Sequence, residues 1–528
     1  MAKEAGITTV PSAIGGVDFF SSLFGMPAEN AIRLVNWWPD VYGCVHRRGF
    51  REWERGAPGN VESIYAFHSR FGQDFLYAFA GTEMLDVTSL DATPDPVVTG
   101  LASALWQATM FANSAGTHKV FVNGIDDPIW LHQVTPPAID YDRLTAGDGI
   151  VAGTISGVNP NDFVDITIHQ KRLWFVEKDT TYGWYLPPEQ VWGVASKFDF
   201  GPLFKRGGYL QSLATWTIDS SDGPDDLLVA FGSEGDVVVY KGIDPDSSTG
   251  DWALQGVYYA GAPIAGHRFH TKVSGDLKFV TTQGLMSMNT MFTSSQTVAP
   301  QNSVEQQMVQ QFIAEQANLY GFLPGWDLKF LAAFNMLILN IPSVTQEGSL
   351  QLVENVVNSK WSTFLGLDAT CWVTDYQEFP FFGSDDRVIQ GWVGNTDNVT
   401  PEDPAGKPIT ALVQQAYNFF GTPANNKQVG LFRPNFLTTS KVAWKAIVSY
   451  DFTFKIPMLQ FFPPQVGVPA WDQAIWDASY WSGGLHAQKA WASAEGMGFA
   501  GSLSMATRSD GEVVWVNTDF TISSGGIL

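Results

Sequence analysis

Short apolar segments that alternate with polar turns recur along most of the chain. In each repeat, a run of β-branched and aromatic residues leads through a turn into a second apolar run. The turns contain Gly, Asn and Asp, which tolerate the backbone angles of tight hairpins, whereas β-branched and aromatic residues favour strands. The pattern predicts a mainly β protein built from successive hairpins. The turns are centred near residues 82, 124, 179, 234, 284, 347 and 385.

The spacing of these turns indicates a repeated unit. Successive centres are 38 to 63 residues apart. Radial repeats of four short strands take roughly 40–50 residues per blade. The spacing therefore favours a β-propeller of about six to seven blades over residues 60–395. Because the steps are irregular, two β-sandwiches in series are the alternative.

One segment, residues 303–319, has a helical pattern. Ser303 and Gln306 form an S-x-x-Q capping box, which is typical of a helix N-terminus. Apolar residues then follow at helical spacing. We expect one amphipathic helix inserted between blades, with its apolar face packed on the protein or, alternatively, on a partner. The apolar residues are Val304, Met308, Val309, Phe312 and Ile313.

The rest of the chain falls into three parts. Residues 396–408 contain Pro401, Pro404 and Gly406 and are predicted to be a linker. Residues 409–528 return to the strand pattern and predict an additional, Trp-rich C-terminal β domain. Residues 1–59 are interpreted as an N-terminal segment that contains a basic strand and contacts another subunit or an adaptor.

The charge of the chain limits its partners. It carries 53 acidic and 30 basic residues, a net charge of −23, and residues 1–395 hold 43 of the acidic and 22 of the basic residues. Binding of nucleic acid through bulk charge requires Lys and Arg to displace counterions, so this class is excluded. Charged residues make up only 16% of the chain and aromatic residues 14%. Such a balance is typical of surfaces covered by other subunits.

The sequence also lacks the patterns of a membrane span and of a secretory signal. No apolar run approaches the roughly 18 residues of a membrane span. The N-terminus does not have the pattern of a secretory signal. Cys44 and Cys371 are far apart in the sequence and are expected to be free thiols. We therefore expect a protein made in the cytoplasm, with no membrane span.

Motifs for catalysis or metal binding are not found in the sequence. His267 and His270 form the one close histidine pair, and residues three apart on a strand face opposite sides, so they make a poor chelate. We expect no enzyme activity, no cofactor and no metal site. The alternative is a carbohydrate-binding or carbohydrate-active propeller. Paired carboxylates such as Asp385 and Asp386, together with 20 Trp, favour it.

Two clusters are candidates for functional residues. Four arginines interleaved with aromatic residues can bind phosphates or a partner's acidic groups. We predict a subunit or adaptor contact there, and the alternative is an edge hairpin with local ion pairs. The arginines are Arg47, Arg48, Arg51 and Arg55.

The second cluster consists of C-terminal tryptophans. Such residues form either the core of a small β domain or the anchors of an interface with another subunit or a tail fibre. These tryptophans are Trp471, Trp476, Trp481 and Trp491.

Three stretches, in this order, resemble one known family. Residues 36–51 contain an N-x-x-P sequence followed by a basic strand, residues 168–242 contain IHQKRLWFV and DLLVAFG, and residues 469–498 contain PAWDQAIWDASYWSGG. Together they resemble the tail hub or nozzle proteins of short-tailed bacteriophages, also called packaged-DNA stabilisation proteins.

The resemblance implies a β-propeller with extra β domains in a structural protein of the virion tail. It implies a ring of identical subunits, commonly a homohexamer, that contacts the adaptor near the portal and the tail fibres or spikes. Genomic DNA is retained by the ring and passes through it at ejection without sequence-specific binding. No catalytic residue is implied.

The charge of the chain agrees with such a role. A channel that lets a stiff polyanion slide should not hold phosphates tightly. An acidic wall repels DNA, and salt confines this repulsion to about 8–10 Å from the wall. We therefore expect the four arginines to contact protein and not DNA.

Overall fold

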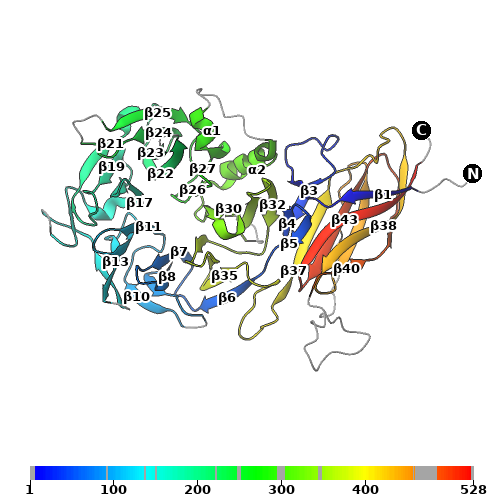
Figure 1. Cartoon of the computed structure of the whole chain (residues 1–528), viewed down its shortest axis with the longest axis horizontal. Coiled ribbons are helices and arrows are strands. Elements are labelled where there is room, and N and C mark those ends of the chain that lie inside the picture. Colours follow the sequence, from blue (N-terminus) through cyan, green and yellow to red (C-terminus); the bar gives the residue numbers. More distant parts are fainter. Residues whose placement is uncertain are drawn as a thin grey trace, which may run out of the picture.

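The computed structural model describes residues 6–90, 93–135, 138–148, 151–220, 223–246, 251–293, 304–342, 348–455, 457 and 484–524. These residues form two β domains that lie side by side, a propeller and a smaller second domain (Figure 1). The prediction of a mainly β protein with a propeller and an additional C-terminal β domain is confirmed. No described helix is long and apolar enough to cross a membrane.

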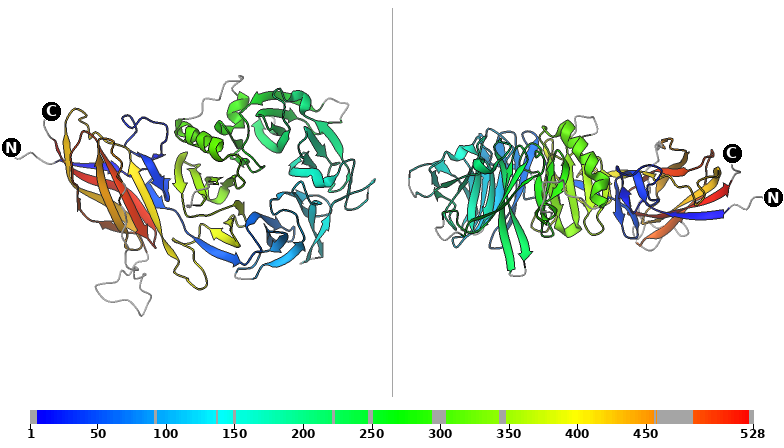
Figure 2. Two further views of the ribbon diagram at one scale, coloured as in Figure 1. Left: turned by 180° about the vertical axis from the view of Figure 1, so that it is seen from behind. Right: turned by 90° about the horizontal axis from the view of Figure 1, so that it is seen from above.

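The propeller consists of antiparallel sheets arranged radially, which the views from two sides show (Figure 2). In the described residues six of the blades are separate sheets, and a further blade is the first part of a ten-stranded sheet that continues into the second domain. Contacts between neighbouring blades run around the whole ring: the inner strands β7, β11, β17 and β22 contact one another in turn, β22 contacts β27 of blade 5, and β26, β29, β33 and β7 contact one another in turn.

The first three blades have four strands each, and the first strand in the chain is the innermost. Blade 1 contains β7 (Val61–His68), β8 (Asp74–Ala80), β9 (Glu83–Asp86) and β10 (Asp95–Thr99). Blade 2 contains β11 (Gln107–Ala112), β12 (Thr117–Val122), β13 (Ile129–Thr135) and β14 (Ala138–Arg143). Blade 3 contains β17 (Phe163–His169), β18 (Arg172–Glu177), β19 (Tyr182–Tyr185) and β21 (Ser196–Asp199).

The remaining blades complete the ring. Blade 4 contains β22 (Leu210–Ser220), β23 (Gly223–Gly232), β24 (Asp236–Lys241) and β25 (Ala253–Tyr259). Blade 5 contains β26 (His270–Val273), β27 (Asp276–Thr281) and β28 (Gly284–Ser287). Blade 6 contains β29 (Asp327–Leu331), β30 (Met336–Ile341), β31 (Leu350–Asn355) and β32 (Lys360–Phe364). Blade 7 contains β33 (Cys371–Thr374), β34 (Pro380–Ser384), β35 (Arg387–Gly391) and, from the N-terminal part of the chain, β6 (Phe50–Arg55).

Short elements connect the blades. Three strands pair in parallel with each other between blades 2 and 3, and three 3-10 helices lie in the loops. They are β15 (Thr145–Ala146), β16 (Thr154–Ser156), β20 (Gly193–Val194), η1 (Pro160–Asp162), η2 (Gly201–Leu203) and η3 (Ala332–Phe334).

Two helices follow β28 in blade 5. They are α1 (Met288–Thr293) and α2 (Val304–Tyr320), and α2 packs against β28. Val309, Ile313 and Ala317 on α2 are buried in the main hydrophobic core. The predicted inserted helix and its packing face are therefore confirmed. Ser303 of the expected capping box lies outside the described residues.

The core of the propeller is shared between neighbouring blades. Apolar clusters lie between blades 1 and 2, 2 and 3, 3 and 4, 6 and 7, and 7 and 1. The second strand of a blade faces a neighbouring blade on each side, so β30 is buried at every position. Burial of one large apolar side chain contributes roughly 1.5–3 kcal/mol. Both faces of these strands therefore contribute to stability, which explains their nearly continuous apolar sequences.

The turn of blade 2 shows how local sequence sets a hairpin. Gly124 has a φ of +73°, and a Cβ atom there would lie 2.4 Å from Val164 Cγ1. The Asn123 side-chain oxygen accepts the N–H groups of Ile125 and Asp126 at 3.0 and 2.8 Å. Glycine is needed both for the backbone angle and for the close approach of blade 3.

The second domain has two sheets that pack face to face. Trp444 of β39 contacts Phe432 and Phe436 of β38 across the interface, at ring-centroid distances of 6.2 and 6.5 Å. One sheet contains β1 (Gly6–Pro11), β4 (Trp37–Asp40), β5 (Gly43–His46), β38 (Lys427–Thr438), β40 (His486–Lys489), β41 (Ala492–Ser493) and β43 (Val513–Ser524). The other contains β2 (Gly16–Val17), β3 (Asn30–Val35), β36 (Thr396–Asp397), β37 (Lys407–Gln415), β39 (Ala443–Tyr450) and β42 (Gly501–Ser509).

Within the described residues, the predicted N-terminal segment, residues 1–59, does not form a separate part of the structure. Strands β1 to β5 belong to the second domain, where β1 pairs with β43 and β3 with β37. Strand β6 pairs with β35 and closes the propeller. The described residues of the predicted segment 1–59, which begin at Gly6, are therefore divided between both domains. The predicted linker 396–408 contains a hairpin, in which β36 pairs with the start of β37. The β1–β43, β3–β37 and β6–β35 pairings join residues hundreds of positions apart, which a local pattern does not reveal.

Candidate functional site

Arg47 lies inside the junction of the two domains and not at the surface. Its side chain is 1% exposed. Both terminal nitrogens donate to Asp397, Nη1 to Oδ1 at 2.7 Å and Nη2 to Oδ2 at 2.6 Å. Nε donates to Asn36 Oδ1 at 2.9 Å, and Nη2 donates to the Leu365 carbonyl at 3.0 Å. The predicted direct contact of Arg47 with another subunit is therefore wrong, because this guanidinium is buried and fully used within the chain.

The other three arginines of the cluster remain candidates for contacts. Arg48 is 39% exposed and donates from Nη1 to Asn395 Oδ1 at 2.9 Å. Arg55 is exposed at the end of β6. Arg51 donates from Nε to Gln390 Oε1 at 2.7 Å, and its guanidinium lies over the ring of Trp53 at 5.4 Å. A subunit or adaptor contact through these residues stays a prediction.

A local ion pair also occurs on this strand. Arg387 Nη1 lies 3.6 Å from Glu52 Oε2 across the β35–β6 pair. The alternative of an edge strand with local ion pairs therefore describes part of the cluster. Burial raises the pKa of Glu54 to about 8, and the negative charges of Asp86 and Asp95 add to this.

The axis of the propeller is closed by buried and half-buried polar side chains. Arg268 precedes β26 in blade 5 and reaches across the axis to blades 1 and 2. It donates to the Glu62 carbonyl at 2.9 Å, to Ser63 Oγ at 2.6 Å and to the Trp106 carbonyl at 2.9 Å. The cavity that remains there is about 170 Å³. Since water occupies roughly 30 Å³ per molecule, this space holds only a few waters.

A serine, a histidine and an aspartate meet at this axis without forming a catalytic triad. Ser212 Oγ donates to Asp165 Oδ2 at 2.5 Å, and His270 Nε2 lies 2.8 Å from the same hydroxyl. A serine nucleophile must give its proton to the imidazole. Here the proton is directed to the carboxylate, so His270 Nε2–H is left to donate to the hydroxyl. The arrangement is a hydrogen-bond chain that fills the axis.

The two histidines expected on opposite faces of one strand, His267 and His270, lie on the same side. His267 lies before β26, so both His267 and His270 line the axial cavity and do not face opposite sides of a strand. His267 Nδ1 donates to the Gln211 carbonyl at 2.8 Å. Within the described ranges, no group of three or more His, Cys, Asp or Glu could hold a metal ion.

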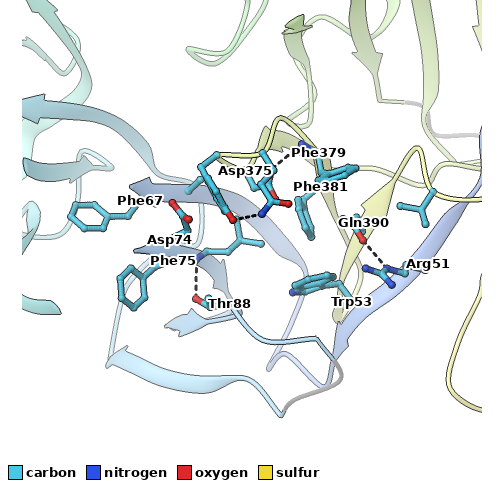
Figure 3. Close-up of a pocket in the computed structure, with 15 residues that line it drawn as sticks. Arg51, Trp53, Phe67, Asp74, Phe75, Thr88, Asp375, Phe379, Phe381 and Gln390 are labelled. Carbon is cyan, nitrogen blue, oxygen red and sulfur yellow. Dashed lines mark hydrogen bonds between the residues drawn. The ribbon is translucent and has the colours of Figure 1, made fainter. Parts of the chain in front are cut away.

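A larger cavity, of about 530 Å³, lies where blade 7 meets blade 1 (Figure 3). Arg51 and Trp53 on β6 form one part of the lining, and the loop 375–379 between β33 and β34 forms another. Arg51 and Trp53 both line this cavity, and the Arg51 guanidinium lies 5.4 Å from the centre of the Trp53 ring. Sequence patterns indicated the arginine, but they did not indicate the loop that lies opposite it.

The C-terminal tryptophans are described only in part. Trp471, Trp476 and Trp481 lie outside the described residues. The Trp491 ring is 42% exposed and lies under the Arg433 guanidinium at 4.6 Å. Trp491 is therefore not a core residue, and its role as an interface anchor stays a prediction.

Comparisons with known proteins add no argument on the fold or the function. The chain matches no described protein family and no curated protein. Among solved structures it is similar to a chain described as "YCF48 bound to D1 peptide", with 10% sequence identity and a TM-score of 0.37. The match covers 66% of this chain and 98% of that chain. A likeness at this level carries no functional argument.

Replacement of Arg47 tests its structural role. We expect Arg47→Ala to lower the free energy of unfolding by about 3–5 kcal/mol, because the variant leaves the Asp397 carboxylate without its partner in a mostly buried site. The neighbouring variant Arg48→Ala is the control and should change stability by less than about 0.5 kcal/mol. Denaturant unfolding of both variants measures the difference, and equal effects would contradict the assignment.

The half-buried His270 predicts a dependence of stability on pH. Burial lowers the pKa of His270 from 6.5 to about 4. Between pH 6.5 and about pH 4 the unfolded state binds more protons at His270 than the folded state does. The neutral His270 therefore contributes its full stabilisation above pH 6.5, and this stabilisation is lost as the pH falls toward about 4. We expect His270→Gln to reduce the loss of stability between about pH 7 and about pH 5 by roughly 2 kcal/mol. An unchanged slope in denaturant titrations at the two pH values would disprove it.

Proposed function

We propose that this chain is a structural subunit of the tail of a short-tailed bacteriophage, in which copies form a ring around a passage for DNA. The observation that carries the proposal is the order of three sequence stretches, residues 36–51, 168–242 and 469–498, which resemble tail hub or nozzle proteins. The proposed ring retains packaged DNA and provides the channel for its ejection.

The closed propeller axis supports a passage between copies and not through one subunit. An axial cavity of about 170 Å³, crossed by Arg268, leaves no room for a DNA duplex. A subunit of this shape can take part in a DNA channel only if the passage lies between copies. The proposal therefore requires an oligomer, and a homohexamer is the form that the resemblance implies.

The charge of the chain supports a passage of this kind. A net charge of −23 per copy gives an assembled ring a strong negative field. Low affinity for phosphates lets DNA slide, and salt limits the repulsion to the vicinity of the wall. No sequence-specific binding of DNA is involved.

An exposed aromatic patch on the second domain is suited to contacts between copies. We call it the apolar rim, and it consists of the contacting pair Phe24 and Phe452. Phe24 is 69% exposed and packs on Phe452 at a ring-centroid distance of 4.2 Å. Phe20 and Phe454 are also exposed. Contiguous exposed apolar side chains mark interaction surfaces. In the proposed ring the apolar rim contacts a neighbouring copy.

The remaining contacts follow from the same proposal. Arg48 and Arg55 are exposed on the N-terminal part and are available to an adaptor near the portal. Tail fibres or spikes attach to the outside of the ring. The assembled protein then lies in the virion tail after synthesis in the host cytoplasm.

A substitution in the apolar rim tests the assembly. We expect Phe24→Ser to abolish or strongly reduce the ring in native mass spectrometry, because it removes an apolar side chain from the contact while leaving the subunit folded. Phe322→Ser is the matched control, since Phe322 is similarly exposed, at 73%, but lies in the propeller. A wild-type chain that stays a single subunit at every concentration, and is missing from virions, would overturn the proposal.

A further inference from the structure

The cavity between blades 7 and 1 has the size and lining of a binding site for a small molecule. Its volume of about 530 Å³ lies within the range of roughly 300–1,000 Å³ that is usual for ligand pockets. Its walls come from the strand that closes the propeller, from blade 1 and from the loop 375–379 of blade 7 (Figure 3). The first two walls are close to each other in the sequence, and the β6–β35 pairing brings the distant loop of blade 7 to them.

Aromatic rings form the apolar part of the lining. Trp53 and Phe381 pack edge to face, with centroids 5.0 Å apart, which fixes the position of the indole. Trp53 Nε1 also donates to the Val87 carbonyl at 2.8 Å. Tyr376 and Phe379 are 48% and 37% exposed, so part of each ring is open to solvent. Such rings offer flat surfaces for the apolar faces of a ligand.

Hydrogen-bonding groups with planar geometry lie beside these rings. Arg51 is oriented by its bond from Nε to the buried Gln390. In the loop 375–379, Asp375 Oδ1 accepts the N–H of Phe379 at 2.8 Å, and Gln377 donates to the Tyr376 hydroxyl. These bonds restrain the side chains before any ligand arrives, which lowers the entropic cost of binding.

The charges of the lining nearly balance. Arg51 is the one cation of the lining, and Asp74 and Asp375 are its two acids. Asp74 is paired with the imidazole of His68. Burial raises the pKa of Asp375, and the neighbouring Asp74 and Glu378 add to this, so its negative charge is disfavoured. A lining with this balance does not select a phosphate or another strongly charged group.

We infer that this cavity binds a neutral saccharide of about one or two sugar rings. The apolar faces of a sugar pack on Tyr376, Phe379 and Trp53. Its hydroxyl groups bond to Arg51 and Asp375, which can donate and accept respectively. The inference uses no residue of the apolar rim, so binding of a sugar and assembly through the apolar rim can each fail without the other.

Saturation-transfer NMR on the full chain, with lactose, maltose and N,N′-diacetylchitobiose as the probes, tests this inference. We expect at least one of the three sugars to bind. Tyr376→Ala should raise its dissociation constant about threefold to tenfold through the lost stacking, and Arg51→Ala about tenfold through the lost hydrogen bonds. Tyr141→Ala is the matched control, because Tyr141 is 40% exposed on β14 in blade 2, and it should leave binding unchanged.

Three results would overturn the inference. One is the lack of any signal from the three sugars with the folded chain. Another is binding that both cavity variants leave unchanged. The third is a particle map in which a segment of a second copy fills the cavity. Circular dichroism of each variant shows that a loss of binding does not come from loss of the fold.

Discussion

The pairing of β6 with β35 is the interaction on which the rest of the structure depends. It adds a strand from the N-terminal part of the chain to the last blade and so closes the propeller. The same strand is connected through residues 47–49 to β5 of the second domain, and the Arg47–Asp397 ion pair holds this crossing. Closure also places Arg51 and Trp53 against blade 1. Ring closure, the domain junction and the cavity at the seam are thus consequences of one strand pairing.

Buried charge has structural roles at two places in this protein. Arg47 connects Asn36, Leu365 and Asp397 at the domain junction, and Arg268 connects blade 5 to blades 1 and 2 across the propeller axis. Each guanidinium finds several oxygen acceptors, which offsets the cost of its removal from water. Because Arg268 and its neighbours occupy the axis, a DNA duplex cannot pass through the propeller. Any channel built from this protein has its walls on the outer surfaces of the subunits.

The aromatic composition is explained in large part by packing within the chain. Three aromatic rings stack between blades 3 and 4. The ring centroid of Trp252 lies 5.7 Å from that of Trp174 and 5.1 Å from that of Tyr240. Large flat side chains also fill the space between other neighbouring blades. A high aromatic content is therefore weaker support for subunit interfaces than the sequence suggested. The residues that matter for interfaces are the exposed ones, such as those of the apolar rim.

The amino-acid sequence determined the hairpins, the inserted helix and the propeller. Each predicted turn that the structure describes lies between the second and third strands of a blade, as Gly124 does between β12 and β13, and the turn centred near residue 347 falls outside the described residues. These hairpins were predictable because the second strand is buried on both faces and leaves an uninterrupted apolar run beside a turn of Gly, Asn and Asp. Only the tertiary structure decided that the described part of residues 1–59 divides between two domains, that Arg47 is buried and that Arg51 faces a cavity with the loop 375–379. Those outcomes depend on pairing between residues more than three hundred positions apart, and local periodicity carries no information about such partners.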